Sequence, residues 1–337
     1  MIHTYIIEQE YIDTSYLMYQ SRILDFYFGK KKIGVLDIET TGLNPQYSHF
    51  ILGGLLIFQE DGVRVKQYFA ENLQEEKQTL TAFLDEAKKM DILITYNGKH
   101  FDIKYLKTRM AELGLSDENL FPYNFDLYLM INGHSSLRKL LPNLKQKTVE
   151  NFMGLWSSRK DEISGAESVE LYKRYLSTKD SDLRDLILLH NRDDILQLSQ
   201  LLPVLKKVDI HKGFFSLGFP VESLSISKIT MEAKELKIWG HQRYPISYSS
   251  YGLDDSPCFL DFDRYSKDFY IGLPIIRRSV LGIVDTKSFE KDFSSLSKYE
   301  TFENGFLVLQ QGDHIHYIEI NHFVKLLLER VLEVINR

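Results

Sequence analysis

Two carboxylates, Asp37 and Glu39, are the first side chains whose spacing suits chemistry; they lie in the stretch GVLDIETTGL (34–43). The apolar residues around them predict a strand, and a strand places side chains i and i+2 on the same face. Carboxylates held so close repel each other, whereas Mg²⁺ or Mn²⁺ accepts both as ligands. The pair therefore indicates a metal site. The alternative is an edge strand whose acids face water.

A second pair, His190 and Asp194, lies in the stretch HNRDDIL (190–196). Apolar residues recur at helical spacing from Leu183 to Leu205, and a helix brings residues i and i+4 onto one face. Asp193 would point to the other side of His190 and is the poorer partner. A histidine beside metal-bound carboxylates is suited to deprotonate a water molecule. The alternative is a His–carboxylate contact with no catalytic role.

A further acid, Asp102 in NGKHFD (97–102), stands near the start of a predicted helix. The helix dipole alone commonly explains an acid there. However, the ends of strands in open α/β sheets are also where ligands bind. Asp126 has a similar position, and we interpret it as a supporting or helix-capping residue.

The elements that must position these acids predict a mixed α/β sheet. The strand 33–39 is followed by an apolar run, 49–60, and an alternating run, 63–69, which together indicate an antiparallel hairpin. Helical periodicity covers residues 74–90, and 91–96 is a short buried strand.

Composition is that of an ordinary soluble protein, with 337 residues, 44% apolar and 26% charged residues and a net charge of −6. The length suits two domains. The longest apolar run, 51–58, is too short to span a membrane, and Glu8 and Glu10 argue against a signal peptide. The single cysteine, Cys258, excludes an internal disulfide and indicates a reducing cytoplasm.

The charge changes sign between residues 135 and 160, where Glu150 is outnumbered by basic residues. These basic residues are Arg138, Lys139, Lys145, Lys147, Arg159 and Lys160. Phe152 and Trp156 are interleaved with them. Cations that meet phosphates and rings that stack on bases would suit single-stranded nucleic acid. The alternative is a solvated basic helix face.

The remaining third, residues 206–337, contains no comparable chemistry. Strand-like runs occur at 223–231, 259–262, 269–276, 306–310 and 314–320, with a hairpin turn at Gly312-Asp313. Residues 323–335 form an amphipathic terminal helix. We interpret this region as a small α+β accessory domain that guides substrate, binds a partner or covers the sheet. His314 and His316 would share a strand face, and surface histidines are the favoured interpretation over a metal site.

These motifs resemble the DEDD superfamily of metal-dependent 3′–5′ exonucleases, which have the ribonuclease H-like fold. DIETTGL (37–43), NGKHFD and HNRDDIL resemble the three exonuclease motifs in order, over about residues 33–205. KQKTVENF (145–152) and the stretch 159–167 resemble the connecting region of the YprB-like ribonuclease H-like subgroup. One departure is the interval of four residues from His190 to Asp194, since the His-type enzymes have five and the Tyr-type enzymes have four.

The resemblance implies a two-metal-ion site. Two divalent cations, Mg²⁺ or Mn²⁺, would be held by Asp37, Glu39, Asp102 and Asp194, with His190 as the general base. Nucleic acid, DNA or RNA and single-stranded, would be the partner. The expected substrate contacts are the sugar-binding turn with its Leu43 wedge, the pocket lining and the basic stretch: Thr40, Thr41, Leu43, Asn97, Phe101, Arg138 and Lys139.

The predicted organisation is an N-terminal lead-in packed on the sheet (1–32), a ribonuclease H-like exonuclease domain (33–205) and the accessory domain (206–337). The leading interpretation is a 3′–5′ exonuclease acting on DNA or RNA ends. An endonuclease or structure-specific nuclease with the same site is one alternative. A non-catalytic nucleic-acid-binding protein is another, and the four clustered acids argue against it because phosphates must sit there.

Overall fold

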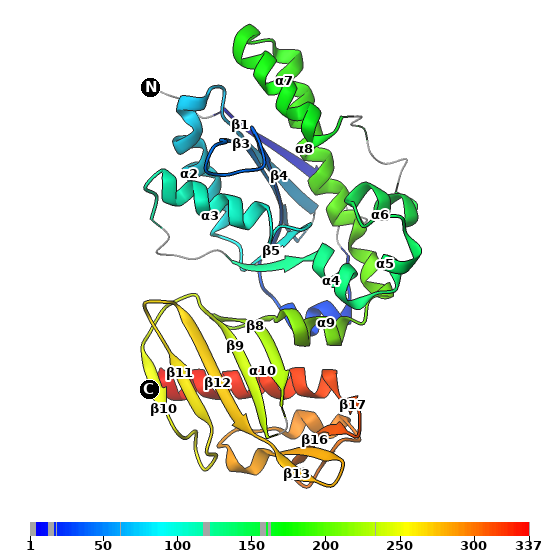
Figure 1. The fold of residues 1–337 in the computed structure, drawn as a ribbon, viewed down its shortest axis with the longest axis vertical. Helices are drawn as coiled ribbons and strands as arrows, with labels where there is room; N and C mark the ends of the chain where they lie inside the picture. The colour runs from blue at the N-terminus through cyan, green and yellow to red at the C-terminus, as the bar shows by residue number, and fades with distance from the viewer. Residues whose placement is uncertain are drawn as a thin grey trace. The chain divides into compact units, whose positions relative to one another are not determined.

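The computed structural model describes residues 5–12, 17, 19–60, 62–116, 122–155, 160, 163–232 and 234–336 (Figure 1). Trp156 and Arg159 of the predicted basic stretch lie outside these residues. The chain divides into two compact units, Met1–Val208 and Asp209–Arg337. Among the described helices, none combines the length and apolar character needed to cross a membrane.

The first unit is built on a six-stranded mixed sheet, with strand order β1-β4-β3-β2-β5-β6. The strands are β1 (Tyr5–Ile12), β2 (Ile33–Thr40), β3 (Phe50–Phe58), β4 (Gly62–Phe69), β5 (Ile92–Thr95) and β6 (Tyr123–Asp126). Strands β2, β5 and β6 run parallel, and the other pairings are antiparallel. The mixed sheet predicted from the sequence is confirmed, and β1 of the N-terminal segment extends it as an edge strand.

Helices cover both faces of this sheet (Figure 1). The helices are α1 (Arg22–Phe28), α2 (Glu76–Ala87), α3 (Asp102–Glu112), α4 (Leu127–His134), α5 (Leu137–Leu140), α6 (Gln146–Phe152), α7 (Gly165–Thr178) and α8 (Ser181–Leu201), with 3₁₀ turns at Leu73–Glu75 and Leu202–Lys207. Helices α2 and α3 pack on one face, and α7 and α8 pack on the other.

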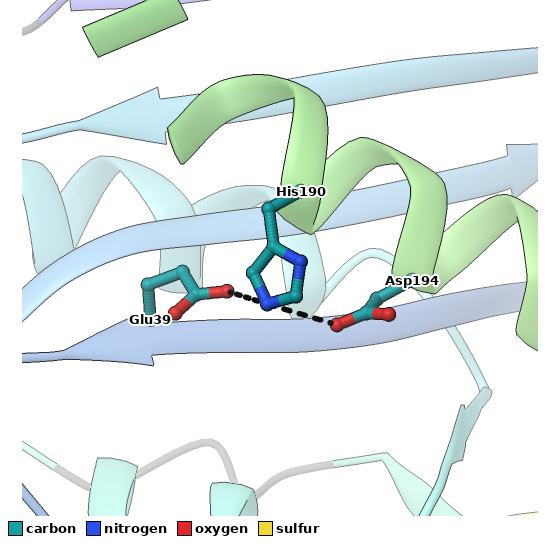
Figure 2. Close-up of side chains that lie close together, drawn as sticks. All are labelled: Glu39, His190 and Asp194. Atoms are coloured by element: carbon teal, nitrogen blue, oxygen red, sulfur yellow. Dashed lines mark ion pairs between the residues drawn. The ribbon is translucent and has the colours of Figure 1, made fainter. Parts of the chain in front are cut away.

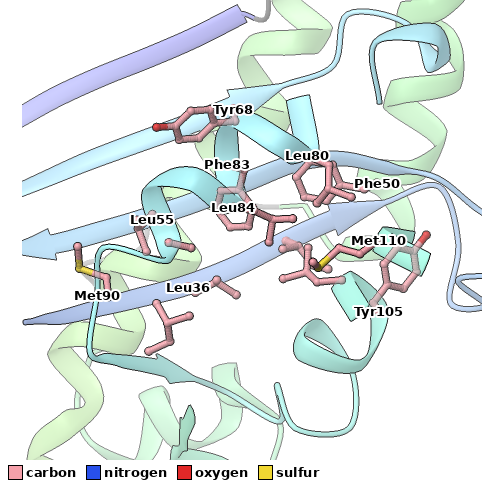
Figure 3. Packing of buried hydrophobic residues seen from close by; sticks show 14 residues of the cluster. Leu36, Phe50, Leu55, Tyr68, Leu80, Phe83, Leu84, Met90, Tyr105 and Met110 are labelled. Atoms are coloured by element: carbon pink, nitrogen blue, oxygen red, sulfur yellow. The ribbon is translucent and has the colours of Figure 1, made fainter. Parts of the chain in front are cut away.

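The two faces of β2 have opposite chemistry because side chains alternate along a strand. Leu36 and Ile38 belong to the core beneath α2 and α3, where Phe50 and Phe83 stack with ring centroids 5.6 Å apart (Figure 3). The intervening Asp37 is therefore on the opposite face, the one that α8 covers. The core of the sheet thus fixes the direction in which the acids of β2 point.

Helix α8 is fixed at its start and along one side. The Asp180 carboxylate accepts a hydrogen bond from the backbone N–H of Asp182 and so caps the helix. Ile187 and Leu188 then pack with Phe69 of β4 and with residues of α7 in a buried apolar cluster. These contacts set the rotation of α8, and with it the side of the helix that faces β2.

The second unit consists of two antiparallel sheets and two helices, α9 (Ile210–Leu217) and α10 (Tyr317–Ile335). The first sheet has the order β10-β11-β12-β9-β8-β7, and the second has the order β13-β14-β16-β15 with β17 beside β16. Their strands are β7 (Pro220–Val221), β8 (Leu224–Met231), β9 (Glu235–Gln242), β10 (Tyr248–Ser250), β11 (Phe259–Phe262), β12 (Asp268–Pro274), β13 (Ile276–Arg278), β14 (Leu281–Asp285), β15 (Phe302–Glu303), β16 (Phe306–Gln311) and β17 (His314–Ile315), with 3₁₀ turns at Thr286–Ser288 and Ser294–Lys298. The predicted α+β class of this region is confirmed.

One predicted element of the second unit is wrong. The run 314–320 was expected to be a strand, but β17 ends at Ile315 and α10 begins at Tyr317. Alternation in Tyr-Ile-Glu-Ile fits a strand locally, whereas the buried residues Ile320, Phe323 and Val324 recur at helical spacing. Packing of the longer apolar stripe therefore decides the conformation.

Candidate metal centre

Three side chains from two elements of the first unit, β2 and α8, lie close together. Glu39 comes from the end of β2, and His190 and Asp194 come from consecutive turns of α8 (Figure 2). His190 Nε2 lies 3.6 Å from Glu39 Oε1 and 3.6 Å from Asp194 Oδ2. One ligand atom from each of the three lies within 4.8 Å of the others, which is close enough to share a metal ion.

Glu39 has an environment that disfavours its charge. The residue is only 6% exposed. Burial raises the pKa of Glu39 to about 7, and the Asp194 carboxylate adds to the rise while His190 opposes it. His190 and Asp194 therefore shift the pKa of Glu39 in opposite directions. A bound cation would stabilise the charged form of Glu39 and so lower its pKa.

Asp37 lies two residues before Glu39, on the same face of β2. Burial raises its pKa well above the ordinary value, and the carboxylates of Asp194, Asp102 and Glu39 raise it further. The Asn191 amide opposes this rise, because its Nδ2 donates to Asp37 Oδ2 at 2.9 Å. Asp37 therefore belongs electrostatically to the same acidic site, although it lies outside the tightest three-residue group.

Asp102 is the first residue of α3 and is 4% exposed. Burial raises its pKa to about 7, and the nearby carboxylates of Asp126 and Asp194 add to the rise. Its Oδ1 is buried with no hydrogen-bond donor from the described part of the chain. A buried carboxylate oxygen without a donor is what a cation ligand looks like when only the protein is present.

The donor set fits a hard divalent cation. Four carboxylates act on one another here: Glu39 and Asp102 are buried, and Asp37 and Asp194 are half-buried. Three of them, Asp37, Glu39 and Asp102, have raised pKa values. Oxygen donors of this kind favour Mg²⁺ and Mn²⁺, and imidazole nitrogen is compatible with Mn²⁺. The structure therefore contains an acidic group suited to metal binding.

Two neighbouring acids serve the backbone instead. The Asp126 carboxylate accepts hydrogen bonds from the backbone N–H groups of Asn97, Lys99 and Leu129, the last of which caps α4. This agrees with its predicted supporting role, since it fixes the loop that leads to Asp102. Asp193 Oδ2 accepts a hydrogen bond from the backbone N–H of Lys160 at 2.5 Å.

In the turn after β2, the two threonine hydroxyls make hydrogen bonds within the protein, whereas Leu43 is exposed. Thr40 Oγ1 donates to Gly42 O at 2.9 Å, and Thr41 Oγ1 accepts from the His49 N–H at 2.8 Å. Both hydroxyls therefore shape the turn. Leu43, in contrast, is 84% exposed at its tip, where an apolar side chain has no packing reason to be.

The other predicted substrate contacts have open positions. Asn97 is partly exposed and has a positive φ of 63°, as a tight turn requires. Phe101 is partly exposed beside Tyr105, with ring centroids 5.7 Å apart. Arg138 and Lys139 are exposed on the short helix α5.

Two buried amide side chains at the site, those of Asn191 and Gln67, were not identified from the sequence. Asn191 is fully buried, and its Oδ1 accepts a hydrogen bond from Gln67 Nε2 at 2.9 Å. The available signals were a polar residue beside His190 on a helix and the pair Gly53-Gly54 in a central strand, since glycine inside a strand marks close approach.

Comparison with known proteins assigns the chain to a family. The model described as RNase_H superfamily matches residues 35–206. The chain belongs to the RNase_H superfamily. This superfamily of nucleases uses divalent metals and acts on nucleic acid, so the predicted fold and the broad nuclease interpretation agree with it.

Individual relatives of this RNase_H superfamily member match over part of their length. It is 31% identical over 178 residues to the uncharacterized protein YprB of Bacillus subtilis (strain 168), which covers 52% of this chain and 42% of YprB. It is 35% identical over 97 residues to a DNA polymerase of Thermococcus sp. (strain GE8), which covers 26% of this chain and 6% of the polymerase. The resemblance to YprB-like proteins inferred from the motifs is confirmed.

A solved structure also matches. The family B DNA polymerase from the hyperthermophilic archaeon Pyrobaculum calidifontis aligns with a TM-score of 0.42 and 20% sequence identity, covering 52% of this chain and 24% of the polymerase. In each of these three proteins, the matched part is less than half of that protein's own length.

Proposed function

We propose that the first unit is a metal-dependent nuclease that removes nucleotides from the 3′ ends of single-stranded DNA or RNA. The observation that carries the proposal is the convergence of Glu39, His190 and Asp194, with Asp37 and Asp102 coupled to them electrostatically. Membership of the RNase_H superfamily supports it. A protein that only bound nucleic acid would gain nothing from acids placed against phosphates.

The four carboxylates Asp37, Glu39, Asp102 and Asp194 would hold two divalent cations, Mg²⁺ or Mn²⁺. When bound, such ions stabilise the charge that develops on phosphorus and lower the pKa of water. Asp102 brings a buried Oδ1 to which no described residue donates a hydrogen bond, and Glu39 and Asp194 both lie beside His190 Nε2. The protein thus supplies a preorganised set of oxygens from β2, α3 and α8.

His190 takes the role of general base in this proposal. Its Nε2 faces Glu39 and Asp194, so a proton from the attacking water is received at that atom and is stabilised by both carboxylates. His190 is buried, with 4% of the residue exposed, and both carboxylates already lie beside its Nε2. The reaction therefore needs little rearrangement of this side chain.

Several of the residues proposed to contact the substrate are exposed. Leu43 would pack beside the terminal base, and the Thr40–Thr41 turn would hold the terminal sugar through its backbone. Arg138 and Lys139, both exposed, would meet phosphates of the strand. Asn97 and Phe101 would line the same pocket.

The test is end-labelled single- and double-stranded DNA and RNA, incubated with the full chain and Mg²⁺, Mn²⁺ or EDTA. We expect metal-dependent release of nucleotides one at a time from the 3′ end. Internal fragments would instead indicate an endonuclease with the same site. Tight binding without cleavage under any metal condition would overturn the nuclease assignment.

The matched variants lie on one helix. Asp194→Asn keeps the shape of the side chain but removes a metal ligand, and we expect it to lose at least about 10²-fold in rate, as for other groups essential to the transition state. Asp185→Asn, on the exposed side of α8, is the control and should cleave at the wild-type rate. Equal rates for Asp194→Asn and the wild type would contradict the assignment.

A further inference from the structure

A chain of buried amides links β4 to β2 through α8. Gln67 Nε2 donates to Asn191 Oδ1 at 2.9 Å and to Leu188 O at 2.8 Å. Asn191 Nδ2 donates to Asp37 Oδ2 at 2.9 Å and to the Asp37 main-chain O at 3.2 Å. Gln67 is 2% exposed and Asn191 is fully buried, so water does not compete for these bonds.

Each amide in this chain has a defined orientation. Gln67 offers an N–H group to Asn191, which requires the oxygen of the Asn191 amide on that side. The Asn191 NH₂ group must then face Asp37, where it meets both the main-chain and the carboxylate oxygen. One carboxylate oxygen, Oδ2, is thereby engaged, and Oδ1 is left as the oxygen available to a cation.

The backbone of the intervening strand leaves room for this chain. Strand β3 lies between β4 and β2, and Gly54 is paired with Asp37 in the register. A Cβ at position 54 would lie 2.1 Å from Asn191 Oδ1. The absence of a side chain at this residue is therefore a condition for the Asn191 amide to reach Asp37.

We propose that Asn191 is a positioning residue for the metal ligand Asp37 and that Gln67 acts through Asn191 by fixing the orientation of its amide. The inference rests on the proposed function, because it assumes that Asp37 binds a cation. It adds a second layer of residues that sets how tightly the site holds metal. Hydrogen bonds to metal-ligating carboxylates typically contribute 10–100-fold in metal affinity.

The experiment measures Mn²⁺ affinity of the full-length protein by isothermal titration calorimetry and by electron paramagnetic resonance, with no nucleic acid present. We expect Asn191→Ala to weaken Mn²⁺ binding by about 10–100-fold. Gln67→Met, which preserves volume, should weaken it by a smaller factor. Adding Gln67→Met to Asn191→Ala should cause no further loss of Mn²⁺ affinity, because Gln67 acts only through Asn191.

The control is Asn321→Ala in the second unit. Asn321 is also fully buried on a helix, and its Nδ2 donates to His211 O at 2.8 Å, so its substitution removes a buried helix amide without touching the metal site. Its Mn²⁺ affinity should equal that of the wild type. Thermal unfolding in EDTA reports the structural cost of every variant separately.

The outcomes separate this inference from the proposed function. Mn²⁺ binding that is lost in Asp194→Asn but unchanged in both Asn191→Ala and Gln67→Met would overturn the inference and leave the metal site standing. Additive losses in the double variant would overturn the relay through Asn191. A wild-type protein that binds no Mn²⁺ would overturn both the inference and the proposed function.

Discussion

His190 occupies an unusual place for a general base, because its Nε2 lies at equal distances of 3.6 Å from two carboxylates. The same atom is well placed to bind a cation. The roles of general base and metal ligand differ in whether His190 contributes to metal binding in the absence of substrate. A base acts on the reaction alone, whereas a ligand also contributes to metal affinity.

The variant His190→Gln distinguishes these roles. If His190 is the base, the cleavage rate falls by about 10²–10⁴-fold, and the Mn²⁺ dissociation constant stays within about twofold of the wild type. We expect this result. The measurements are single-turnover cleavage and Mn²⁺ titration of the same preparation. A matching loss of Mn²⁺ affinity would reassign His190 as a ligand, and an unchanged rate would remove it from the reaction.

The raised pKa values of Glu39 and Asp102 predict a pH dependence of stability. Both carboxyls have a pKa of about 7 in the folded protein and about 4 when unfolded. Between these values the folded state binds more protons than the unfolded state, so the free energy of unfolding falls as pH rises. In the metal-free protein, the stabilisation is full below about pH 4 and is lost as pH passes 7.

Urea unfolding in EDTA at pH 5.5, 6.5 and 7.5 measures this slope. The stability of Glu39→Gln should be less sensitive to pH than that of the wild type, since the substitution removes one of the carboxyls with a raised pKa. Glu112→Gln, an exposed residue at the end of α3, should keep the wild-type slope. Stability that rises with pH over this range would show that these carboxyls are not held in their protonated form.

At the scale of elements, β3 has a separate requirement on each face. A Cβ at Gly53 would lie 2.6 Å from the Phe83 ring, in the core beneath α2. A Cβ at Gly54 would lie 2.1 Å from Asn191 Oδ1, on the side of the metal site. The two glycines therefore serve apolar packing and ligand positioning respectively.

Alanine substitutions at Gly53 and Gly54 distinguish apolar packing from ligand positioning. Both Gly53→Ala and Gly54→Ala should lower the free energy of unfolding by about 1–3 kcal/mol, the usual cost of overpacking. Only Gly54→Ala should also weaken Mn²⁺ binding, because it displaces the Asn191 amide. Chemical unfolding and Mn²⁺ titration of both variants check this. Equal Mn²⁺ affinities for the two variants would contradict the separation.

The sequence predicted what depends on local spacing and missed what depends on distant pairing. Asp37 with Glu39, and His190 with Asp194, are recognisable because each pair lies within one strand or one helical turn. Asn191 bonds to Asp37 across 154 positions and to Gln67 across 124, so no local pattern reveals its role. The misassigned start of α10 has the same cause, since a short alternation was outweighed by the packing of a longer stripe.

The organisation of the whole molecule gives each unit its own core. Buried clusters in the first unit join the sheet to α2, α3, α7 and α8, and the second unit has fully buried residues such as Ile271 and Phe323. The candidate metal site lies entirely within the first unit. Metal binding should therefore stabilise one unit directly.

Differential scanning calorimetry tests this at the scale of the chain. We expect two transitions, of which Mn²⁺ raises the temperature of one, by several degrees at 100 times its dissociation constant. Ile271→Ala should lower the other transition, because it opens a cavity in the second unit. A single transition that responds to both changes would show that the units unfold together.

The placement of His190, Asn191 and Asp194 on α8 limits how the gene can change over evolution. An inserted or deleted residue between positions 190 and 194 would turn everything beyond it by about 100° around the helix axis. It would separate Asp194 from the histidine, because the apolar stripe before it is locked in place. Functional descendants should therefore keep both the identities of His190, Asn191 and Asp194 and the spacing between them, because a change of length here is as damaging as the loss of one of the side chains.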